Sequence, residues 1–272
     1  MGFVRNKRFS VLELVGLAAF LGWALSAYHN ALPGAFADAE APTSEALINC
    51  AVPHVFSPNT LADANQVNAN FAALVACIQS LDERTQFISI VQGDLDGLAG
   101  PHMLIEGANI HVRSGTGATD DFGTLAGLGN LVVGYDENAG GRNRSGSHNL
   151  VIGRDHTYSS FAGIVAGEHN KITGDSASVV GGQFNEASDS AAAVLGGGFN
   201  LASKLRATVS GGENNTSSQI GASVAGGHNN LASAGNSTAV GGENNVAGAP
   251  QSVVVGGEQN QTTATRSAIL GG

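Results

Sequence analysis

The sequence is poor in charged and aromatic residues, and these shortages exclude several classes of protein. Charged residues make up 12% of the 272 positions, which is about half of the usual share. The net charge is −10, and so acidic a balance opposes binding to a nucleic-acid backbone. Aromatic residues make up 6%, so the large side chains that dominate ordinary globular cores are scarce.

Proline and cysteine are also scarce. With six prolines and no glycine at every third position, a collagen-like triple helix is excluded. Two cysteines are too few for a disulfide-dense scaffold, and their spacing does not match a zinc motif. What the chain does have is 42% apolar residues, which opposes disorder, and 39 glycines. Small apolar side chains and many glycines fit thin layers that stack closely.

The N-terminus predicts a targeting or anchoring segment with an apolar helix over residues 1–37. Arg5, Lys7 and Arg8 precede an apolar run, and a small-residue cleavage site follows at residues 35–37. This order is typical of a secretory signal peptide. An uncleaved membrane anchor is one alternative. A second is a prepilin-like leader, because residues 8–14 resemble the processing site of type IV prepilins, although Arg8 stands where prepilins carry glycine.

All three alternatives place the remaining chain outside the cytoplasm. We therefore expect an exported protein, extracellular or at the cell surface, that meets a membrane only through its N-terminal segment. Residues 38–60 contain three prolines and many small residues, and we expect a linker there.

A short coiled-coil helix is predicted over residues 61–86. Its apolar residues are spaced four and three apart in alternation, which is the pattern of a coiled-coil seam. The seam consists of Val67, Phe71, Leu74, Ile78 and Leu81. Because a seam of about two heptads is too short for a stable isolated helix, we expect the helix to pair with copies of itself. A single amphipathic helix lying on its own domain is the alternative.

Cys50 and Cys77 flank the start of this region. In an oxidising compartment they can form a disulfide, within one chain or between chains. An unstrained bridge would stabilise the fold by about 3 kcal/mol. Two reduced, half-buried thiols are the alternative.

The C-terminal half is a repeat of 15 residues, preceded by two steps of 14. Each repeat carries an aliphatic residue, a Gly-Gly pair that starts two positions later, and an asparagine four positions after the first glycine. These positions are Val179, Val194, Val209, Val224 and Val254; Gly181, Gly196, Gly211, Gly226, Gly241 and Gly256; and Asn185, Asn200, Asn215, Asn230, Asn245 and Asn260. A fixed period of this kind is the signature of a stacked repeat architecture.

The repeat predicts an all-β fold, a parallel β-solenoid with 14–15 residues per coil over residues 127–272. The recurrent aliphatic residue is expected to face the interior, because neighbours along a strand alternate between faces. The glycine pair is expected at a corner, where it permits positive φ and close approach of backbones. The recurrent asparagine is expected to adopt the left-handed conformation at the other corner and to form an amide-to-amide ladder along the axis. A merely tolerated turn residue is the alternative.

The position directly before the glycine pair is often Val or Leu and is expected to face outward. One branched residue and a few alanines per coil bury little apolar area on their own. We therefore expect copies of the chain to pack together and to cover this outward position.

The segment SVVGG at residues 178–182, with its equivalents every 14–15 residues, resembles the head repeats of trimeric autotransporter adhesins. The resemblance covers residues 127–272. It implies a left-handed β-roll built from three chains and a homotrimer with a structural or adhesive role. The implied partner is a host, matrix or cell-surface ligand. Because the helix precedes the repeats here, whereas adhesin heads usually precede their stalks, we expect the architecture and not the export mechanism to be shared.

Two segments interrupt or precede the repeats. Residues 87–126 are predicted to be a connector with two short strands, at residues 103–106 and 109–113. Residues 135–147 are polar and rich in glycine, and we expect a loop that projects from the stack. This loop and the repeat tips are the expected places for a ligand.

No catalytic, metal or cofactor site is predicted. The eight histidines are scattered, without paired ligand spacing, and no Lys-Ser or Lys-Thr follows the glycine pairs. We therefore expect a non-enzymatic binding protein. An ice- or crystal-binding solenoid is the alternative, although only Thr263 and Thr265 resemble its threonine pairs. An enzyme with its active site between chains is a third hypothesis.

Overall fold

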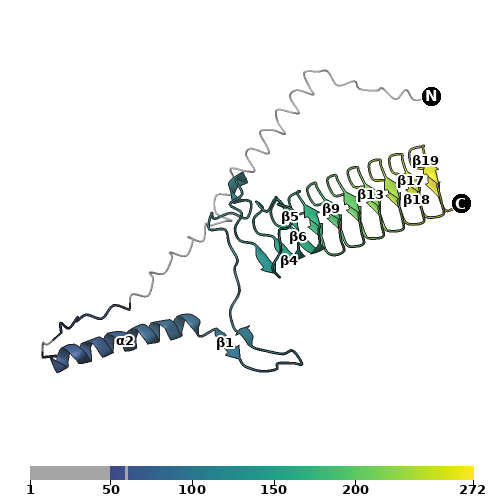
Figure 1. The fold of residues 1–272 in the computed structure, drawn as a ribbon. Coiled ribbons are helices and arrows are strands. Elements are labelled where there is room, and N and C mark those ends of the chain that lie inside the picture. Colours follow the sequence, from purple (N-terminus) through teal and green to yellow (C-terminus); the bar gives the residue numbers. More distant parts are fainter. Residues whose placement is uncertain (1–49, 59–60) are drawn as a thin grey trace, which may run out of the picture. The chain divides into compact units, whose positions relative to one another are not determined.

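The structure, a computed structural model, describes residues 50–58 and 61–272 (Figure 1). The chain divides into two units, Met1–Ala108 and Asn109–Gly272. The predicted N-terminal segment, residues 1–37, and most of the predicted linker, residues 38–60, lie outside the described residues. Within the described part of the chain, none of the helices has the length and apolar character needed to cross a membrane.

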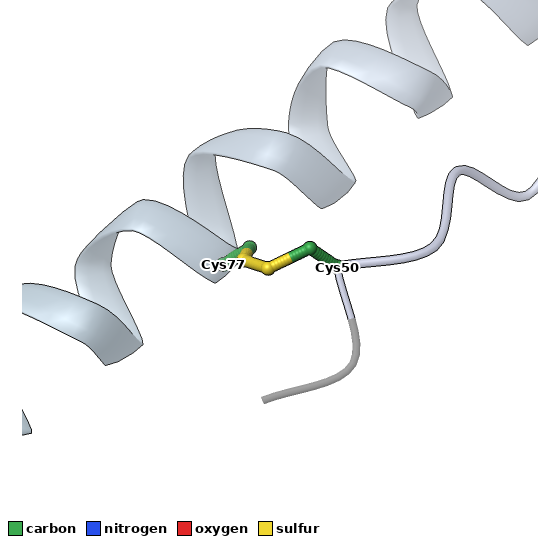
Figure 2. Close-up of a disulfide and its surroundings, with 2 residues drawn as sticks. All are labelled: Cys50 and Cys77. Atoms are coloured by element: carbon green, nitrogen blue, oxygen red, sulfur yellow. A yellow bond between two sulfur atoms is a disulfide. The ribbon is translucent and has the colours of Figure 1, made fainter. Parts of the chain in front are cut away.

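The first unit is organised around helix α2, Ala64–Thr85. Asp63 caps it, because its side chain accepts a hydrogen bond from the Asn65 N–H at 2.7 Å. A disulfide joins Cys50 to Cys77 within the chain (Figure 2). Asn70 adds two hydrogen bonds to the His54 backbone, donating to its carbonyl at 2.7 Å and accepting from its N–H at 2.9 Å. The segment before the helix is therefore attached to it at two points.

A two-stranded antiparallel sheet follows the helix. Strands β1, Ile88–Val91, and β2, His102–Ile105, pair over their full lengths. The expected strand at residues 103–106 thus lies within one residue of β2. The expected strand at residues 109–113 is wrong, since that segment has no regular secondary structure. A strand needs a hydrogen-bonding partner, and the partner of β2 is β1. No strand was predicted from the sequence at the position of β1.

The second unit is a parallel β-solenoid of about nine coils, as predicted. After a 3-10 turn, η1, Asp121–Gly123, the described residues form one sheet of ten strands and one of eight, stacked along one axis (Figure 1). The first sheet contains β3 Leu131–Val133, β4 Leu150–Arg154, β6 Ile164–Glu168, β8 Ser178–Val179, β10 Ala193–Val194, β12 Thr208–Val209, β14 Ser223–Val224, β16 Thr238–Ala239, β18 Val253–Val254 and β20 Ala268–Ile269. The second contains β5 Thr157–Tyr158, β7 Lys171–Ile172, β9 Glu186–Ala187, β11 Leu201–Ala202, β13 Thr216–Ser217, β15 Leu231–Ala232, β17 Val246–Ala247 and β19 Gln261–Thr262.

Neighbouring strands of the solenoid are shifted by one repeat, so equivalent residues stand in register. Val194, for example, is opposite Val209. The core lies between the two sheets and is built from these aligned inward positions. The recurrent aliphatic residue has no exposed surface at Val179, Val194, Val209, Val224 and Val254. Most of the other inward side chains are alanines, so the sheets lie close together.

The two glycines of each pair have different roles. The second glycine has positive φ, which is +80° at Gly212, and a Cβ there would lie 2.1 Å from the carbonyl oxygen of Gly227 in the next coil. The first glycine, Gly211, does not have positive φ, and a Cβ there would meet open space. The expected positive φ and close approach therefore hold for the second glycine of the pair.

This difference predicts unequal effects of two neighbouring substitutions. Gly212→Ala is expected to lower the free energy of unfolding by at least about 2 kcal/mol, because it combines left-handed strain with a backbone clash. Gly211→Ala, the matched control, is expected to change it by less than about 0.5 kcal/mol. Urea unfolding monitored by circular dichroism measures both, and equal losses would contradict this division of roles.

Candidate assembly and binding surfaces

The recurrent asparagine is a buried residue and not the left-handed residue of its corner. Exposure is at most 1% for Asn185, Asn200, Asn215, Asn230 and Asn245. None of them has positive φ, whereas the preceding residue does, as at Asn229 with φ of +55°. The expected left-handed asparagine is therefore wrong. The residue before it makes the turn at the surface, and this turn directs the asparagine side chain into the coil.

The asparagine side chains form a ladder to backbone groups and not from amide to amide. The Oδ1 atom of Asn230 accepts from the N–H of Asn245 in the next coil at 2.9 Å. Its Nδ2 atom donates to the carbonyls of Gly226 at 3.0 Å and of Gly242 at 2.9 Å. The Asn245 N–H and the Gly226 carbonyl have no backbone partner at this corner, and the asparagine side chain provides one for each. The amide-to-amide ladder is wrong for these coils, although Asn260 does donate to Oδ1 of Asn245 at 3.1 Å.

Removal of one such side chain is expected to destabilise the solenoid strongly. Asn230→Ala leaves the Asn245 N–H and the Gly226 carbonyl without a hydrogen-bond partner, whereas the Gly242 carbonyl keeps the N–H of His228. We therefore expect a loss of about 3 kcal/mol in the free energy of unfolding. Asn229→Gly is the matched control, because the left-handed position tolerates glycine at a cost of at most about 1 kcal/mol. Denaturant unfolding of both variants tests this, and equal losses would show that the ladder is dispensable.

One outward position of the first sheet forms an aliphatic row along the axis. We define the aliphatic row as Val180, Leu195, Ser210, Ala225, Val240, Val255 and Leu270, the residues directly before the glycine pairs. Its five large members are 40–82% exposed. Backbone hydrogen bonds between successive coils align the row, as from the Leu195 N–H to the carbonyl of Val209 at 3.0 Å. The outward orientation of the aliphatic row was predicted from the sequence.

A second uncovered apolar surface lies on helix α2. No residue of the helix is buried. Of the predicted seam, Val67 is partly buried, and Phe71, Leu74, Ile78 and Leu81 are 40–65% exposed. The seam residues lie along a single helix, and the coiled coil stays a prediction.

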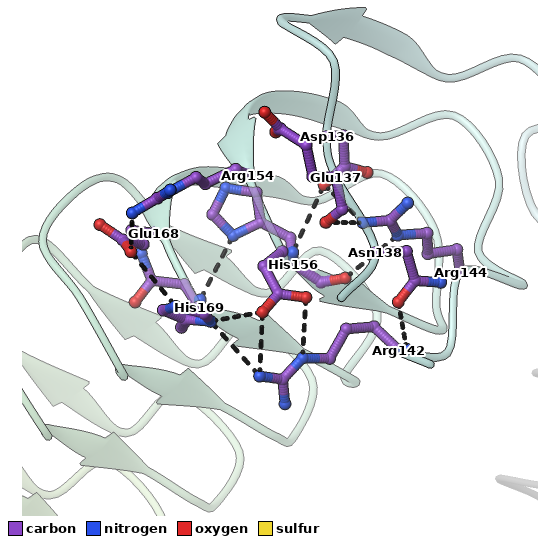
Figure 3. Close-up of polar contacts among 11 residues, drawn as sticks. Asp136, Glu137, Asn138, Arg142, Arg144, Arg154, His156, Glu168 and His169 are labelled. Carbon is purple, nitrogen blue, oxygen red and sulfur yellow. Dashed lines mark hydrogen bonds and ion pairs between the residues drawn. The ribbon is translucent and has the colours of Figure 1, made fainter. Parts of the chain in front are cut away.

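Charged side chains gather at the first coils of the solenoid (Figure 3). Arg142 Nε lies 3.3 Å from Oδ1 of Asp155, and His169 Nδ1 lies 2.6 Å from Oδ2 of the same carboxylate. Arg144 Nη2 lies 3.0 Å from Oδ1 of Asp136. Both aspartates are only 4% exposed, and buried carboxylates require such partners.

These contacts correct the expectation for residues 135–147. Arg142 of this loop donates to Asp155, and Arg144 donates through Nε to the carbonyl of His156 at 3.4 Å, so both arginines attach the loop to the first coils (Figure 3). The pair of Arg144 and Asp136 lies within the loop itself. Tyr158 strengthens the attachment, because its hydroxyl donates to Oδ2 of Asp136 at 3.2 Å. Burial raises the pKa of this phenol. Among the described residues, no group of three His, Cys, Asp or Glu side chains could hold a metal ion.

The attachment of the loop is expected to depend on pH. The hydrogen bond from Arg142 lowers the pKa of Asp155 below its ordinary value of 3.8. A carboxylate with a lowered pKa stabilises the folded state above its ordinary pKa, and this contribution is lost as the pH falls through the lowered value. We therefore expect the free energy of unfolding to decrease below pH 3.8, and Arg142→Gln to weaken that decrease.

Urea unfolding at about pH 7 and about pH 3 measures this dependence. Lys204→Gln is the matched control, because it removes an exposed cation outside the cluster. An unchanged pH dependence in Arg142→Gln would show that the arginine does not govern Asp155.

Stacked aromatic rings form a third surface, at the left-handed position directly before the recurrent asparagine. His169 and Phe184 have ring centroids 4.7 Å apart, and Phe184 and Phe199 have centroids 4.9 Å apart, with planes within 10° of parallel. Phe184 and Phe199 are about half exposed. In later coils the same position holds Asn214, Asn229, Asn244 and Gln259. Along the axis, the exposed aromatic rings of the earlier coils are followed by side-chain amides in the later coils. This corner is therefore a candidate ligand surface.

This corner surface was not predicted from the sequence. The available signal was the position directly before each recurrent asparagine, where phenylalanine occurs twice in successive repeats. It becomes informative only once that position is known to be exposed.

Comparison with known proteins adds no assignment. No family model matches the chain, and the search of curated proteins finds no match. The proposed function therefore rests on the fold and on the surfaces described above.

Proposed function

We propose that this chain is an exported, non-enzymatic structural or adhesive protein that assembles as a homotrimer. In this proposal the solenoid presents repeated surfaces to a host, matrix or cell-surface ligand. The observation that carries the proposal is the aliphatic row, which places five exposed branched side chains along one edge of a regular solenoid.

The aliphatic row favours association with copies of the same chain. Large exposed apolar patches on soluble proteins mark interaction sites. The row has two stretches of large apolar side chains, one at Val180 and Leu195 and one from Val240 to Leu270, on either side of Ser210 and Ala225. Coils stack at a spacing of about 4.8 Å, so the row is a straight ridge with the period of the repeat. The best match for such a period is another copy of the same solenoid. The exposed seam of helix α2 is a second, separate surface of the kind that pairs with its own copies.

The number of copies and the location depend on other features. Three copies are inferred from the resemblance of the repeats to trimeric adhesin heads. Export is supported by the disulfide between Cys50 and Cys77, because disulfides persist in oxidising compartments. The basic and then apolar order of the N-terminal sequence supports the same location.

A binding role is supported by repetition. Each coil repeats the left-handed corner position, so weak contacts with a ligand can occur many times along one rod. Simultaneous contacts raise the overall affinity far above that of a single one. The stacked rings of His169, Phe184 and Phe199 and the following amides are the residues that we expect to make these contacts.

The proposal predicts a specific response of the molar mass. Sedimentation equilibrium of the purified protein is expected to give three times the mass of its own chain. Leu195→Glu places a charge in the aliphatic row and is expected to shift the protein to monomers with an unchanged circular dichroism spectrum. Leu201→Glu, on the outward side of the second sheet, is the matched control and is expected to leave the trimer intact. A monomeric wild-type protein, or a control that dissociates equally, would overturn the proposal.

A further inference from the structure

We infer that copies of this chain stand side by side, parallel and in register. The contact is heterologous (head-to-tail), because a second row of residues on one copy packs against the aliphatic row of the next. We define the turn row as Asp175, Ser190, Leu205, Ile220, Gly235, Pro250 and Thr265. The inference rests on the proposed self-association and names the surface that covers the aliphatic row.

The turn row lies at the corner that leads into the strands of the first sheet. Each member from Asp175 to Pro250 has a carbonyl that accepts from the next coil, as from the Gly221 N–H to Leu205 at 3.1 Å and from the Asn236 N–H to Ile220 at 3.0 Å. The row therefore has one residue per coil in strict alignment. Ile220 is 51% exposed.

The two rows are complementary in size, coil by coil. The aliphatic row holds Val or Leu except in two adjacent coils, where it holds Ser210 and Ala225. In those two coils the turn row holds its branched side chains, Leu205 and Ile220. In the other coils the turn row is small, polar or proline. The pairs are Asp175 with Val180, Ser190 with Leu195, Leu205 with Ser210, Ile220 with Ala225, Gly235 with Val240, Pro250 with Val255 and Thr265 with Leu270. Each coil thus has one large aliphatic residue in the two rows together.

Contact within one chain does not explain this compensation. Four residues separate Leu205 from Ser210, namely the exposed Arg206 of the turn, the inward Ala207, the outward Thr208 and the inward Val209. Thr208 and Ser210 alone are roughly 7 Å apart along the strand, and the turn adds to the separation from Leu205. Direct packing requires heavy atoms within about 4.5 Å. The compensation in size therefore operates between copies that stand side by side.

The direction of the contact follows from the same pairs. If the aliphatic rows of parallel copies met each other, Ser210 and Ala225 would face their own equivalents and leave a gap at the middle of the interface. Such a gap forfeits dispersion contacts. With the turn row seated on the aliphatic row, Leu205 and Ile220 fill that gap. Two different surfaces of each copy are then used, which is a head-to-tail contact that closes into a ring.

Cysteine pairs in the full chain test this arrangement. The double variant Leu205→Cys/Ser210→Cys is expected to form disulfides between neighbouring copies on mild oxidation, and to migrate as a covalent trimer on a non-reducing gel. Ser210→Cys alone is expected to give no covalent dimer, because position 210 faces position 205 of its neighbour. The matched control Leu205→Cys/Val240→Cys, two coils out of register, is also expected to give none. Dimers from Ser210→Cys alone, or equal linking in the control, would overturn the inference.

A size exchange provides a second test that does not require oxidation. Leu205→Ser and Ser210→Leu are each expected to raise the dissociation constant of the trimer about tenfold, through a cavity or through overpacking. The double variant Leu205→Ser/Ser210→Leu is expected to restore it to within about threefold. A double variant no tighter than the weaker single variant would overturn the inference. A monomeric wild type would contradict the proposed function, whereas a wild-type trimer without this rescue would contradict only the seating of the turn row on the aliphatic row.

Discussion

The hydrogen bonds from the recurrent asparagine to the backbone of the adjacent coil are the interaction on which the solenoid depends. The strands of the regular coils are only two residues long, as in β12, Thr208–Val209, and backbone hydrogen bonds between coils continue beyond them, as from the Glu213 N–H to the carbonyl of Gly227 at 3.0 Å. The N–H of the recurrent asparagine has no such backbone partner and pairs with the asparagine side chain of the adjacent coil. The core side chains are mostly alanine and valine and fill little volume. The buried asparagine connects its own corner to the next one. Together with the backbone hydrogen bonds between coils, it holds the register, and the register aligns every outward position into a row.

The period of the sequence was sufficient to predict the solenoid and its inward residues. Alternation along a strand is a local property, and seven consecutive repeats of the glycine pair support the same assignment. The identity of the left-handed residue was not predictable in this way. Asn214 and Asn215 are the same amino acid, and only the three-dimensional corner decides which one turns and which one is buried. The hydrogen-bonding atoms of the ladder depend on that choice.

Segments outside the repeat were predicted less well, for a physical reason. Residues 109–113 have the composition of a strand but occur once, so no aligned copy tests the assignment. The loop at residues 135–147 has a local composition typical of a projecting turn. Its actual position depends on hydrogen bonds from Arg142 to Asp155 and from Arg144 to the carbonyl of His156, which are 13 and 12 positions away in the sequence. Of the candidate surfaces, the aliphatic row was expected from the sequence. The stacked rings and the turn row emerged only from the alignment of corners.

The disulfide of the first unit changes how the chain would carry mechanical load. Cys50 and Cys77 are 27 residues apart, a stretch that would extend by roughly 90 Å if it were pulled straight. With the bond in place, tension applied before Cys50 passes through the two sulfur atoms and enters helix α2 at Cys77. The first turns of the helix, which begins at Ala64, then lie outside the loaded path. The disulfide would therefore prevent force applied at the N-terminal end from unwinding the first turns of the helix, and residues 50–77 would not extend under tension.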